Sequence, residues 1–379
     1  MKKYFTSESV SEGHPDKLCD QISDAILDAC LEQDPYSRVA CEVFVTDNYM
    51  VIGGEITTKA VVDYEKIARK ILKKVGYDDD IFSVSHKSME IAVKINTQSV
   101  DIAMGVDGQE IGAGDQGIMF GFANKETKEY MPFAIKIAND LMHLASKLRK
   151  NGTFKWAKPD MKSQVTLDYT DCHHPKIDTV LMSVQHDPNY DEVEFKTFIK
   201  EHIMDVVAKR HKLNTDFKVL INPTGKFVIG GPKGDTGLTG RKIIADTYGG
   251  YGHHGGGAFS GKDATKVDRS AAYYARYAAK NIVAAGLADT IEIQLSYAIG
   301  KPKPISIFFD TFDSNHVNNE VIMKVLETEF DFSVSGMINE LDLRSPVFLK
   351  TATYGHFGKD HFKWEETDKA KTLAKYLKE

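Results

Sequence analysis

The feature that most constrains the fold of this 379-residue chain is a succession of helix, two strands and helix that occurs three times. The paired strands of the three units begin at Arg38, Ser163 and Thr290, so one unit follows another after about 125 residues. The strand-like runs SQVTLDY and TIEIQLSYAI alternate apolar and polar residues, which favours half-buried, mainly antiparallel strands. We therefore predict an α/β protein of the α+β type, built from three similar units in which helices cover a sheet.

The first unit carries the clearest local signals. Apolar residues recur at helical spacing between His14 and residue 33, and Pro15 suits the first position of a helix. Two strand-like runs, 38–46 and 49–58, are joined by Asp47 and Asn48, which indicates a hairpin. A second helix should end at Gly76, since glycine is favoured directly after a helix. The later units should place helices at 132–149 and near 194–209, and at 267–285 and near 319–330.

Composition limits the classes to which the protein could belong. The formal net charge is −6, with 42% hydrophobic and 27% charged residues, so we expect a soluble globular protein that does not bind nucleic acid. We find no run of about 18 apolar residues and no signal-peptide pattern, and therefore expect a cytoplasmic protein with no membrane partner. The four cysteines, Cys19, Cys30, Cys41 and Cys172, lack zinc-site spacing and are expected to be reduced, buried thiols.

A second unusual feature is the stretch 230–268, which holds 12 of the 29 glycines. Glycine has no Cβ to keep a ligand away from backbone N–H groups, so glycines mixed with Lys and Arg suit a polyanion. The helix predicted from Val267 would also point its positive N-terminus towards this stretch. We interpret the stretch as a phosphate-binding segment with carboxylates available for a divalent metal, and a mobile surface linker is the alternative. Its charged residues are Lys233, Asp235, Arg241, Lys242, Asp246, Lys262, Asp263, Lys266 and Asp268.

Two common nucleotide-binding motifs do not explain this stretch. Residues 256–262 fit G-x-x-x-x-G-K, but Asp263 stands where a P-loop needs Ser or Thr, and no strongly apolar strand leads into it. No G-x-G-x-x-G follows an opening strand, so a dinucleotide-binding fold is disfavoured. Elsewhere, the glycine-rich segment 98–117 reads as a loop that could move over a site. His356 and His361 have no third ligand at helical spacing, so we assign them to ordinary packing.

Five motifs together resemble the S-adenosylmethionine synthetase (methionine adenosyltransferase) family of the bacterial type. They are FTSESVSEGHPDK (5–17), GAGDQG (112–117), INPTGKFVIGGPKGDTGLTGRKI (221–243), DTYGG with HHGGGAFSGKD (246–263), and KVDRSAAY (266–273). They occur in order, and the resemblance extends from about residue 3 to residue 365. It implies three similar domains around a pseudo-threefold axis, partly interleaved along the chain. We place these domains at 1–111, 112–229 and 230–379.

The resemblance implies that the methionine sulfur attacks C5′ of ATP and displaces triphosphate, which is then hydrolysed to pyrophosphate and phosphate. A thioether is already a neutral nucleophile, so the barrier lies in positioning and in charge on the leaving group. That chemistry calls for cations and for magnesium. The implied cofactors are two Mg²⁺ per site and K⁺. The implied assembly is a homo-oligomer, a dimer of dimers, with each active site at the dimer interface.

The residues implied by the resemblance fall into three groups. His14, at the leaving oxygen, and Lys162, Arg241, Lys242 and Lys262 would be catalytic and bind ATP, together with Asp160, Lys226, Phe227, Asp235 and Ala258. Methionine would be bound by Glu55, Gln98, Asp115, Asp235 and Lys266. Asp16 and Asp268 would bind magnesium, and Glu42 would bind potassium, although a glutamate in an apolar strand is more often a solvent-facing residue.

The sequence departs from the family pattern at three places. Lys226 replaces a common arginine, which keeps the charge but loses bidentate geometry. Thr236 replaces a frequent cysteine, and the loop 98–112 is about three residues shorter than in close bacterial relatives, which puts its gating in question. Two other functions are considered: a catalytically silent regulatory subunit of the same fold, and a different polyphosphate enzyme such as a kinase or triphosphatase.

Overall fold

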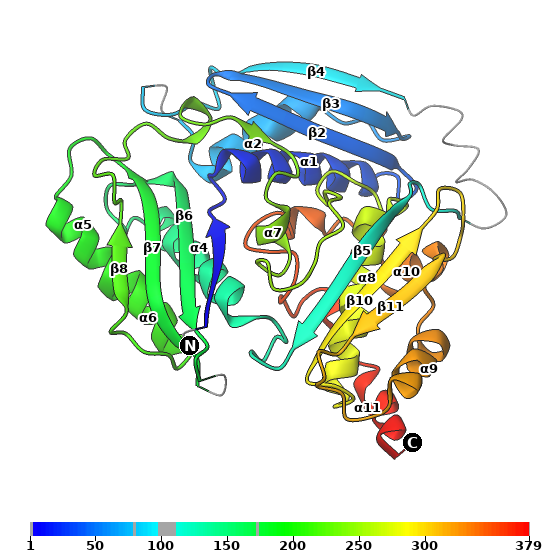
Figure 1. Cartoon of the computed structure of the whole chain (residues 1–379). Coiled ribbons are helices and arrows are strands. Elements are labelled where there is room, and N and C mark those ends of the chain that lie inside the picture. The colour runs from blue at the N-terminus through cyan, green and yellow to red at the C-terminus, as the bar shows by residue number, and fades with distance from the viewer. Residues whose placement is uncertain (1–2, 79–80, 98–110, 172–173, 379) are drawn as a thin grey trace.

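The computed structural model describes residues 3–78, 81–97, 111–171 and 174–378, and within them the chain forms three sheets (Figure 1). The first sheet has the order β4-β3-β2-β9, the second β1-β6-β7-β8 and the third β11-β10-β5. The strands are β1 (Tyr4–Val10), β2 (Arg38–Thr46), β3 (Tyr49–Thr57), β4 (Glu90–Asn96), β5 (Gly117–Asn124), β6 (Ala157–Asp168), β7 (Lys176–His186), β8 (Lys218–Ile221), β9 (Gly237–Leu238), β10 (Thr290–Tyr297) and β11 (Ser306–Asp310).

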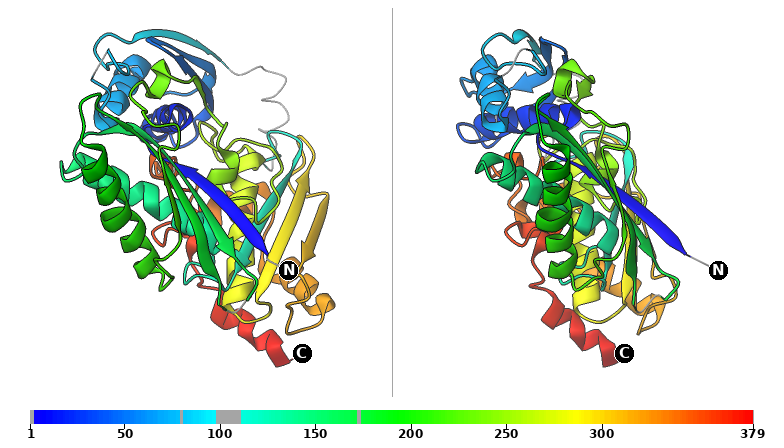
Figure 2. Two further views of the ribbon diagram at one scale, coloured as in Figure 1. Left: turned by 60° about the vertical axis from the view of Figure 1, so that its left-hand side comes forward. Right: turned by 90° about the vertical axis from the view of Figure 1, so that its left-hand side faces the viewer.

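Helices follow and precede the paired strands as predicted. The three units contain α1 (Pro15–Leu31) and α2 (Tyr64–Val75), then α4 (Phe133–Lys150) with α5 (Glu192–Phe198), a π-helical turn (Ile199–Met204) and α6 (Asp205–Arg210), and then α8 (Val267–Ala284) and α9 (Asn319–Glu329). Short helices include α7 (Ile243–Asp246), α10 (Val334–Glu340) and α11 (Ala370–Leu373). Figure 2 shows that α11 and the last turns of the chain lie at one end of the molecule.

The three predicted hairpins, β2 with β3, β6 with β7 and β10 with β11, are confirmed. Among the strand pairs of the described residues, β3 with β4 and β7 with β8 are parallel and the others are antiparallel. The fold is therefore α+β with mainly antiparallel sheets. The strand predicted to start at Ser163 starts at Ala157 instead, because an irregular pairing between Ala157 and Met161 lets β6 begin before the alternation does.

Each sheet includes one strand from a distant part of the chain. β1 pairs with β6, β9 pairs with β2, and β5 pairs with β10. In Figure 1 the dark-blue strand β1 lies beside the green strand β6, on the other side of α1 from the sheet that contains β2 and β3. The three sequence segments are thus interleaved in space, and the boundaries 1–111, 112–229 and 230–379 stay a prediction.

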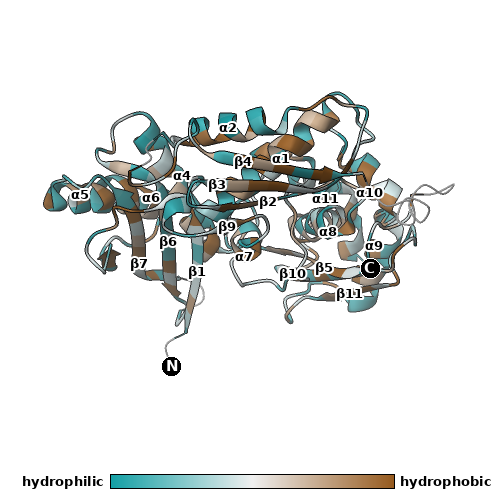
Figure 3. Cartoon of the chain, turned by 90° about the horizontal axis from the view of Figure 1, so that it is seen from above, coloured by the Kyte–Doolittle hydropathy of each residue, from teal (hydrophilic) through white to brown (hydrophobic). Residues whose placement is uncertain are grey.

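The helix α1 is buried between the first sheet and the rest of the molecule. It runs along one side of the β2–β3–β4 sheet and above the other two sheets (Figure 1), and nearly all of its residues are buried. Its neighbour α2 is more strongly two-sided, with Ala68, Ile71, Leu72 and Val75 buried and hydrophilic residues outward, as the colours in Figure 3 show. Gly76, directly after α2, has a φ of 102° in the left-handed region, which confirms the prediction that this helix ends at Gly76.

Buried ion pairs hold α8 in place. Arg269 donates to both carboxylate oxygens of Asp24 at 2.8 Å, and both side chains are at most 1% exposed. Arg276 and Lys280 pair with the buried Glu365 at 2.9 and 2.8 Å. Each of these three cations contacts a carboxylate, with Arg276 and Lys280 sharing Glu365, which offsets part of the large free-energy cost of burying a charge.

Other expectations about the whole chain can be compared with the structure. Cys19, Cys30 and Cys41 are free and buried, as predicted, and Cys172 lies outside the described residues. His356 is buried against Tyr273, with 2.6 Å between its Nδ1 and the tyrosine hydroxyl, and the ring of His361 contacts that of Phe362 at a tilt of 44°, so both histidines take part in packing. Within the described ranges, we find no helix of the length and apolarity needed to cross a membrane.

Candidate active site

The site is organised by a row of buried aspartates on one face of α1. They occur at every fourth position, so their side chains lie one above another along the helix. Each accepts hydrogen bonds of 2.8–2.9 Å from backbone N–H groups of later segments: Asp16 from Leu238, Asp20 from Gly240, Asp24 from Gly261, and Asp28 from Phe348 and Leu349. Hydrogen bonds to Asp16, Asp20 and Asp24 therefore fix the backbone of the glycine-rich stretch against α1. Our sequence analysis missed this role, although the fourfold spacing was visible.

Asp16 is the centre of a first charged cluster. Its carboxylate is fully buried, with Oδ2 2.6 Å from the Lys242 ammonium and Oδ1 3.3 Å from the Arg241 guanidinium. Lys242 and Arg241 are themselves 22% and 45% exposed, so both cations reach the surface of the cluster. The cluster thus presents positive charge outward while the carboxylate holds it from behind.

His14 caps the N-terminus of α1 beside Asp16. Its Nδ1 accepts the Asp16 N–H at 3.1 Å, and its side chain is 1% exposed. Burial lowers the pKa of His14, and with the added effect of the positive charges of Lys242, Lys162, Lys17 and Arg241 it falls to about 2. The imidazole is therefore neutral at physiological pH, and because Nδ1 is an acceptor, its proton lies on Nε2.

A fully buried set of charges, separate from the site itself, lies behind this first cluster. Lys17 pairs with Asp20 at 2.9 Å and with Asp246 of α7. Burial raises the pKa of both aspartates, while the two neighbouring carboxylates outweigh burial and raise the pKa of Lys17. This set joins α1 to α7 and fixes the segment that follows Lys242.

Asp160 and Lys162 approach the cluster from β6. The backbone of Gly13 touches Pro159 so closely that an added Cβ would lie 2.3 Å from the Pro159 carbonyl oxygen. One oxygen of Asp160 accepts the Gly231 N–H at 2.9 Å, and the other, Oδ1, is buried with no hydrogen-bond partner among the described residues. Burial raises the pKa of Asp160 to about 6. Lys162 is exposed and close enough to lower the pKa of His14.

The remaining residues expected on this side lie at the surface. Lys226 and Asp235 are exposed and Phe227 is half-buried. The Phe227 N–H donates to Nε2 of His186 at 3.0 Å, which ties this segment to the end of β7. Asp235 also raises the pKa of Asp160 through its charge, so the two carboxylates are near one another.

A second cluster is formed by Lys262 and Asp268, whose Nζ and Oδ2 atoms are 2.6 Å apart. Asp268 lies in the first turn of α8 and faces the backbone of Gly257. A Cβ on Gly257 would lie 2.2 Å from both Cγ and Oδ1 of Asp268, so only glycine leaves room for the carboxylate. The next residue, Ala258, packs against Gly240, where a Cβ would lie 2.4 Å from that of Ala258.

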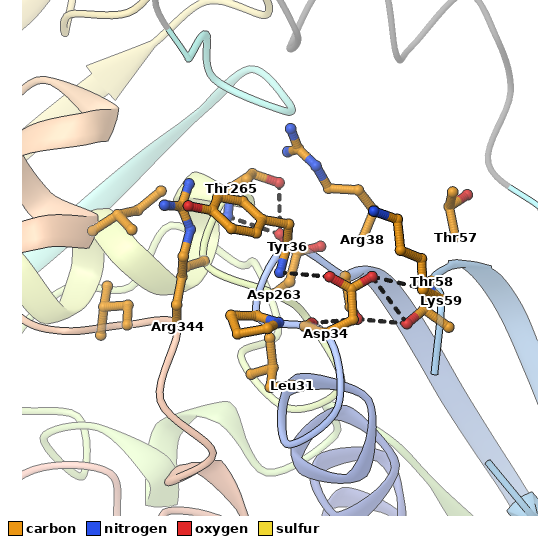
Figure 4. A pocket seen from close by; sticks show the side chains of 15 residues that line it. Leu31, Asp34, Tyr36, Arg38, Thr57, Thr58, Lys59, Asp263, Thr265 and Arg344 are labelled. Atoms are coloured by element: carbon orange, nitrogen blue, oxygen red, sulfur yellow. Dashed lines mark hydrogen bonds between the residues drawn. The ribbon is translucent and has the colours of Figure 1, made fainter. Parts of the chain in front are cut away.

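Lys266 is anchored by Asp263 on the other side of this loop. Its Nζ is 2.6 Å from Oδ2 of Asp263, which also accepts the Val39 N–H at 2.7 Å. Thr265 donates to Oδ1 from its backbone N–H and from its hydroxyl (Figure 4). These contacts, together with Lys266, hold the pKa of Asp263 below its usual value. A cavity of about 440 Å³ opens beside Asp263 and Thr265, and Figure 4 shows Arg38 and Arg344 among the side chains around it.

The residues expected to bind methionine or potassium are largely exposed. Glu42 lies on β2 opposite Gly53, and Glu55 lies on β3 opposite Ala40, both with exposed side chains. Asp115 is exposed, and the neighbouring Gly114 donates its N–H to the carbonyl oxygen of Thr265 at 3.1 Å. The GAGDQG segment therefore lies next to Lys266. Gln98 is outside the described residues.

The structure thus brings the expected residues together in two clusters. The first contains His14, Asp16, Arg241 and Lys242, with Asp160 and Lys162 near it, and the second contains Lys262 and Asp268, with Lys266 and Asp115 near it. Across the described parts of the chain, no hydrogen bond or ion pair joins a side chain of the His14–Lys242 group to Lys262 or Asp268. Nor do the described residues contain a group of three or more His, Cys, Asp or Glu that could hold a metal ion by itself.

Three family models match successive parts of the chain. They are S-adenosylmethionine synthetase, N-terminal domain, at residues 2–100; central domain, at residues 110–227; and C-terminal domain, at residues 229–366. All three descriptions name one family, and the matches together cover most of the chain.

Known proteins are similar over the full length. An S-adenosylmethionine synthase of Mesoplasma florum is 68% identical over 377 residues, covering 99% of this chain and 100% of that protein. The synthase of Mycoplasma capricolum is 65% identical over 379 residues, covering 100% of this chain and 98% of the relative. That of Treponema denticola is 54% identical over 384 residues, covering 99% and 98%.

Proposed function

The chain belongs to the S-adenosylmethionine synthetase family and makes S-adenosylmethionine from ATP and L-methionine, and we propose that the two charged clusters described above bind the triphosphate of ATP from opposite sides. The observation that carries this proposal is the first cluster. It places a neutral imidazole, two cations and a buried carboxylate beside backbone N–H groups of a glycine-rich segment. Such a set suits a leaving group that gains negative charge.

His14 has a specific part in the proposed reaction. When the methionine sulfur attacks C5′ of ATP, the C5′–O bond breaks and charge develops on the leaving oxygen. The neutral ring carries its proton on Nε2, which donates a hydrogen bond to that oxygen. The nucleophile has no proton to lose, so no general base is assigned.

Arg241, Lys242, Lys262 and Lys162 hold the triphosphate in the proposal. The first two are already oriented by Asp16, and Lys262 is oriented by Asp268. Cations that are held in place before the reaction stabilise developing charge without reorganising. The same cations keep the displaced triphosphate bound while water cleaves it to pyrophosphate and phosphate.

The carboxylates fit magnesium as part of a site shared with the substrate. Asp160 has a buried oxygen without a partner, and Asp268 lies in a space that only a glycine at position 257 allows. Magnesium is commonly bound through one or two carboxylates plus substrate phosphates, which agrees with the lack of a three-residue cluster in the described chain. We propose Asp16 and Asp268 as ligands of two Mg²⁺ ions, with Asp160 able to contribute. When bound, magnesium would neutralise charge on the phosphates.

Roles in binding potassium and the substrate methionine can be proposed for Glu42 and for a set of mainly exposed residues. Glu42 offers one exposed carboxylate on the open face of its sheet, so it fits as one ligand of K⁺ whose other ligands lie elsewhere. We propose that Glu55, Gln98, Asp115 and Lys266 bind methionine, with Lys266 pairing with its carboxylate. Asp235, Lys226, Phe227 and Ala258 are proposed to contact ATP or methionine from the rims of the two clusters.

We propose that each active site is completed by a second copy of the chain, in a homodimer that assembles further into a tetramer in the cytoplasm. The lack of a direct contact between the clusters supports this arrangement. So do the exposed apolar residues beside the site residues, such as Phe44 on β2 and Ile118 on β5. The first cluster of one chain would then face the second cluster of its partner.

Mixing two inactive variants tests this assembly. Lys242→Met disables the first cluster and Lys262→Met disables the second. In a mixed dimer one site carries both defects and the other carries neither, so a refolded equimolar mixture should regain about a quarter of wild-type activity. Each variant refolded alone is the control. If the mixture stays as inactive as the two variants, the site is contained in one chain and the proposed assembly is wrong.

A further inference from the structure

A cavity of about 490 Å³ lies away from both clusters, between α4 and the C-terminal segment 350–361. Its lining includes Lys136, Asp140 and His143 from α4, and Lys350, Tyr354 and Lys359 from the C-terminal segment. The rings of His143 and Tyr354 are in tilted contact, with 5.1 Å between their centroids. Asp140 is already paired with Lys136 at 2.9 Å and with His211 at 2.8 Å, so the other lysines of the cavity leave it positively charged.

The ε-amino group of Lys359 has an unusual set of partners. It donates to the carbonyl oxygens of Thr353 at 2.7 Å and Lys350 at 3.0 Å. Within the described parts of the chain it forms no ion pair with a carboxylate. Two carbonyl acceptors satisfy both N–H bonds of a neutral amine and leave its lone pair unused. An ammonium would need an acceptor for a third N–H, and the described residues supply only these two carbonyl oxygens.

Burial and the positive charges near Lys359 also favour the neutral amine. Burial, together with the charges of Lys17 of α1 and Lys136 of α4, lowers the pKa of Lys359 to about 7. Asp246 of α7 and Glu365 oppose them, and Lys359 in turn lowers the pKa of His143. About half of the Lys359 side chains are then neutral amines at pH 7, against roughly one in 3,000 for an ordinary lysine.

We propose that Lys359 is a site of direct acylation by acyl phosphates. The cavity gives a small acyl donor access to the amine, and Lys136 and Lys350 attract its anionic phosphate. The amine lone pair attacks the acyl carbon, an amide C–N bond forms, and the C–O bond to phosphate breaks. Phosphate leaves with the bonding electrons, and the amine gives up one proton to water. The modified side chain is a neutral amide beside Asp246.

Acetyl phosphate is the probe for the test, with the purified full-length enzyme and quantitative mass spectrometry of its peptides. An amine loses intrinsic reactivity as its pKa falls, so the gain from the neutral fraction is partly offset. With a Brønsted coefficient of about 0.5, Lys359 should react roughly 30-fold faster at pH 7 than an ordinary lysine. Lys128, which is 84% exposed, is the internal reference. The rate at Lys359 should level off above about pH 7.

Two substitutions sharpen the result. Lys136→Gln removes a positive neighbour, so the pKa of Lys359 should rise. With the same Brønsted coefficient, a rise of about one pKa unit slows its acetylation at pH 7 roughly twofold and moves the pH at which the rate levels off up by about one unit. Lys155→Gln, a change at a surface residue that is 65% exposed, is the matched control and should leave the rate at Lys359 unchanged. Acetylation of Lys359 no faster than that of Lys128, or a rate at Lys359 that still rises above pH 9, would overturn the proposal.

Discussion

Replacing Gly257 by alanine should damage catalysis while leaving the fold nearly as stable. The new Cβ would lie 2.2 Å from Cγ and Oδ1 of Asp268, whereas an ordinary contact begins at 3.4 Å. The carboxylate must therefore move by about 1 Å, which breaks its 2.6 Å contact with Lys262. Because the φ of Gly257 lies outside the left-handed region, alanine adds no backbone strain there.

The expected loss follows from that displacement. A misplacement of about 1 Å in a reacting arrangement costs on the order of 100-fold in rate, so kcat/KM for S-adenosylmethionine formation should fall by about that factor. The Asp268 side chain can rotate away from the methyl group, so the free energy of unfolding should change by less than about 1 kcal/mol. Steady-state kinetics with chromatographic detection of the product, together with denaturant unfolding, measure the two quantities.

The neighbouring Gly256 is a control with the opposite expectation. Its φ is +96° and an added Cβ would meet nothing within 4 Å. Gly256→Ala should thus lower the free energy of unfolding by about 1–2 kcal/mol through backbone strain, with activity close to wild type. If Gly257→Ala kept kcat/KM within twofold of wild type, the placement of Asp268 would not matter for catalysis and the reasoning would be refuted.

Three further predictions concern single side chains. Lys262→Met should lower kcat by about 100- to 1,000-fold with unchanged thermal unfolding, and wild-type turnover would contradict its assigned contact with triphosphate. Asp24→Asn leaves Arg269 buried without its carboxylate and should lower the free energy of unfolding by about 3–5 kcal/mol in urea, whereas the half-exposed Glu65→Gln should cost less than about 1 kcal/mol. Burial raises the pKa of Asp28 to about 7. Between pH 4 and 7 its folded state therefore binds more protons than the unfolded chain, and this carboxyl's contribution to stability is largest below pH 4 and is lost as pH rises to 7. Asp28→Asn should reduce the fall in unfolding free energy between pH 5 and 8, and an unchanged slope would show that Asp28 does not titrate in this range.

The local sequence pattern was enough to predict the hairpins and the main helices, because the spacing of their apolar residues depends only on neighbouring positions in the chain. It did not reveal β1, which pairs with β6 across more than 150 residues, or β9, whose two residues pair with β2. Both strands owe their existence to partners that are distant in the chain, and no local periodicity records such a partner. The strands β4, β5 and β8 were likewise not predicted from the sequence.

For the candidate site, too, some features could be predicted from the sequence and others only from the fold. The glycines and cations of 230–268 predict a polyanion site from their residue types alone. The contact of Asp16 with Lys242 joins residues 226 positions apart, so only the fold reveals that the first orients the second. The aspartates at 16, 20, 24 and 28 could have suggested a shared function from their spacing, but an acidic row on a helix is usually a solvated surface. Here the row is buried because it accepts backbone hydrogen bonds.

The most direct test of the account is an analysis of all products formed by the purified protein with ATP, methionine, Mg²⁺ and K⁺, with each component omitted in turn. The account predicts S-adenosylmethionine that depends on methionine, together with equal amounts of pyrophosphate and phosphate. Formation of ADP, a phosphorylated acceptor, or no product at all would contradict it, because the two clusters would then not serve displacement and cleavage of triphosphate.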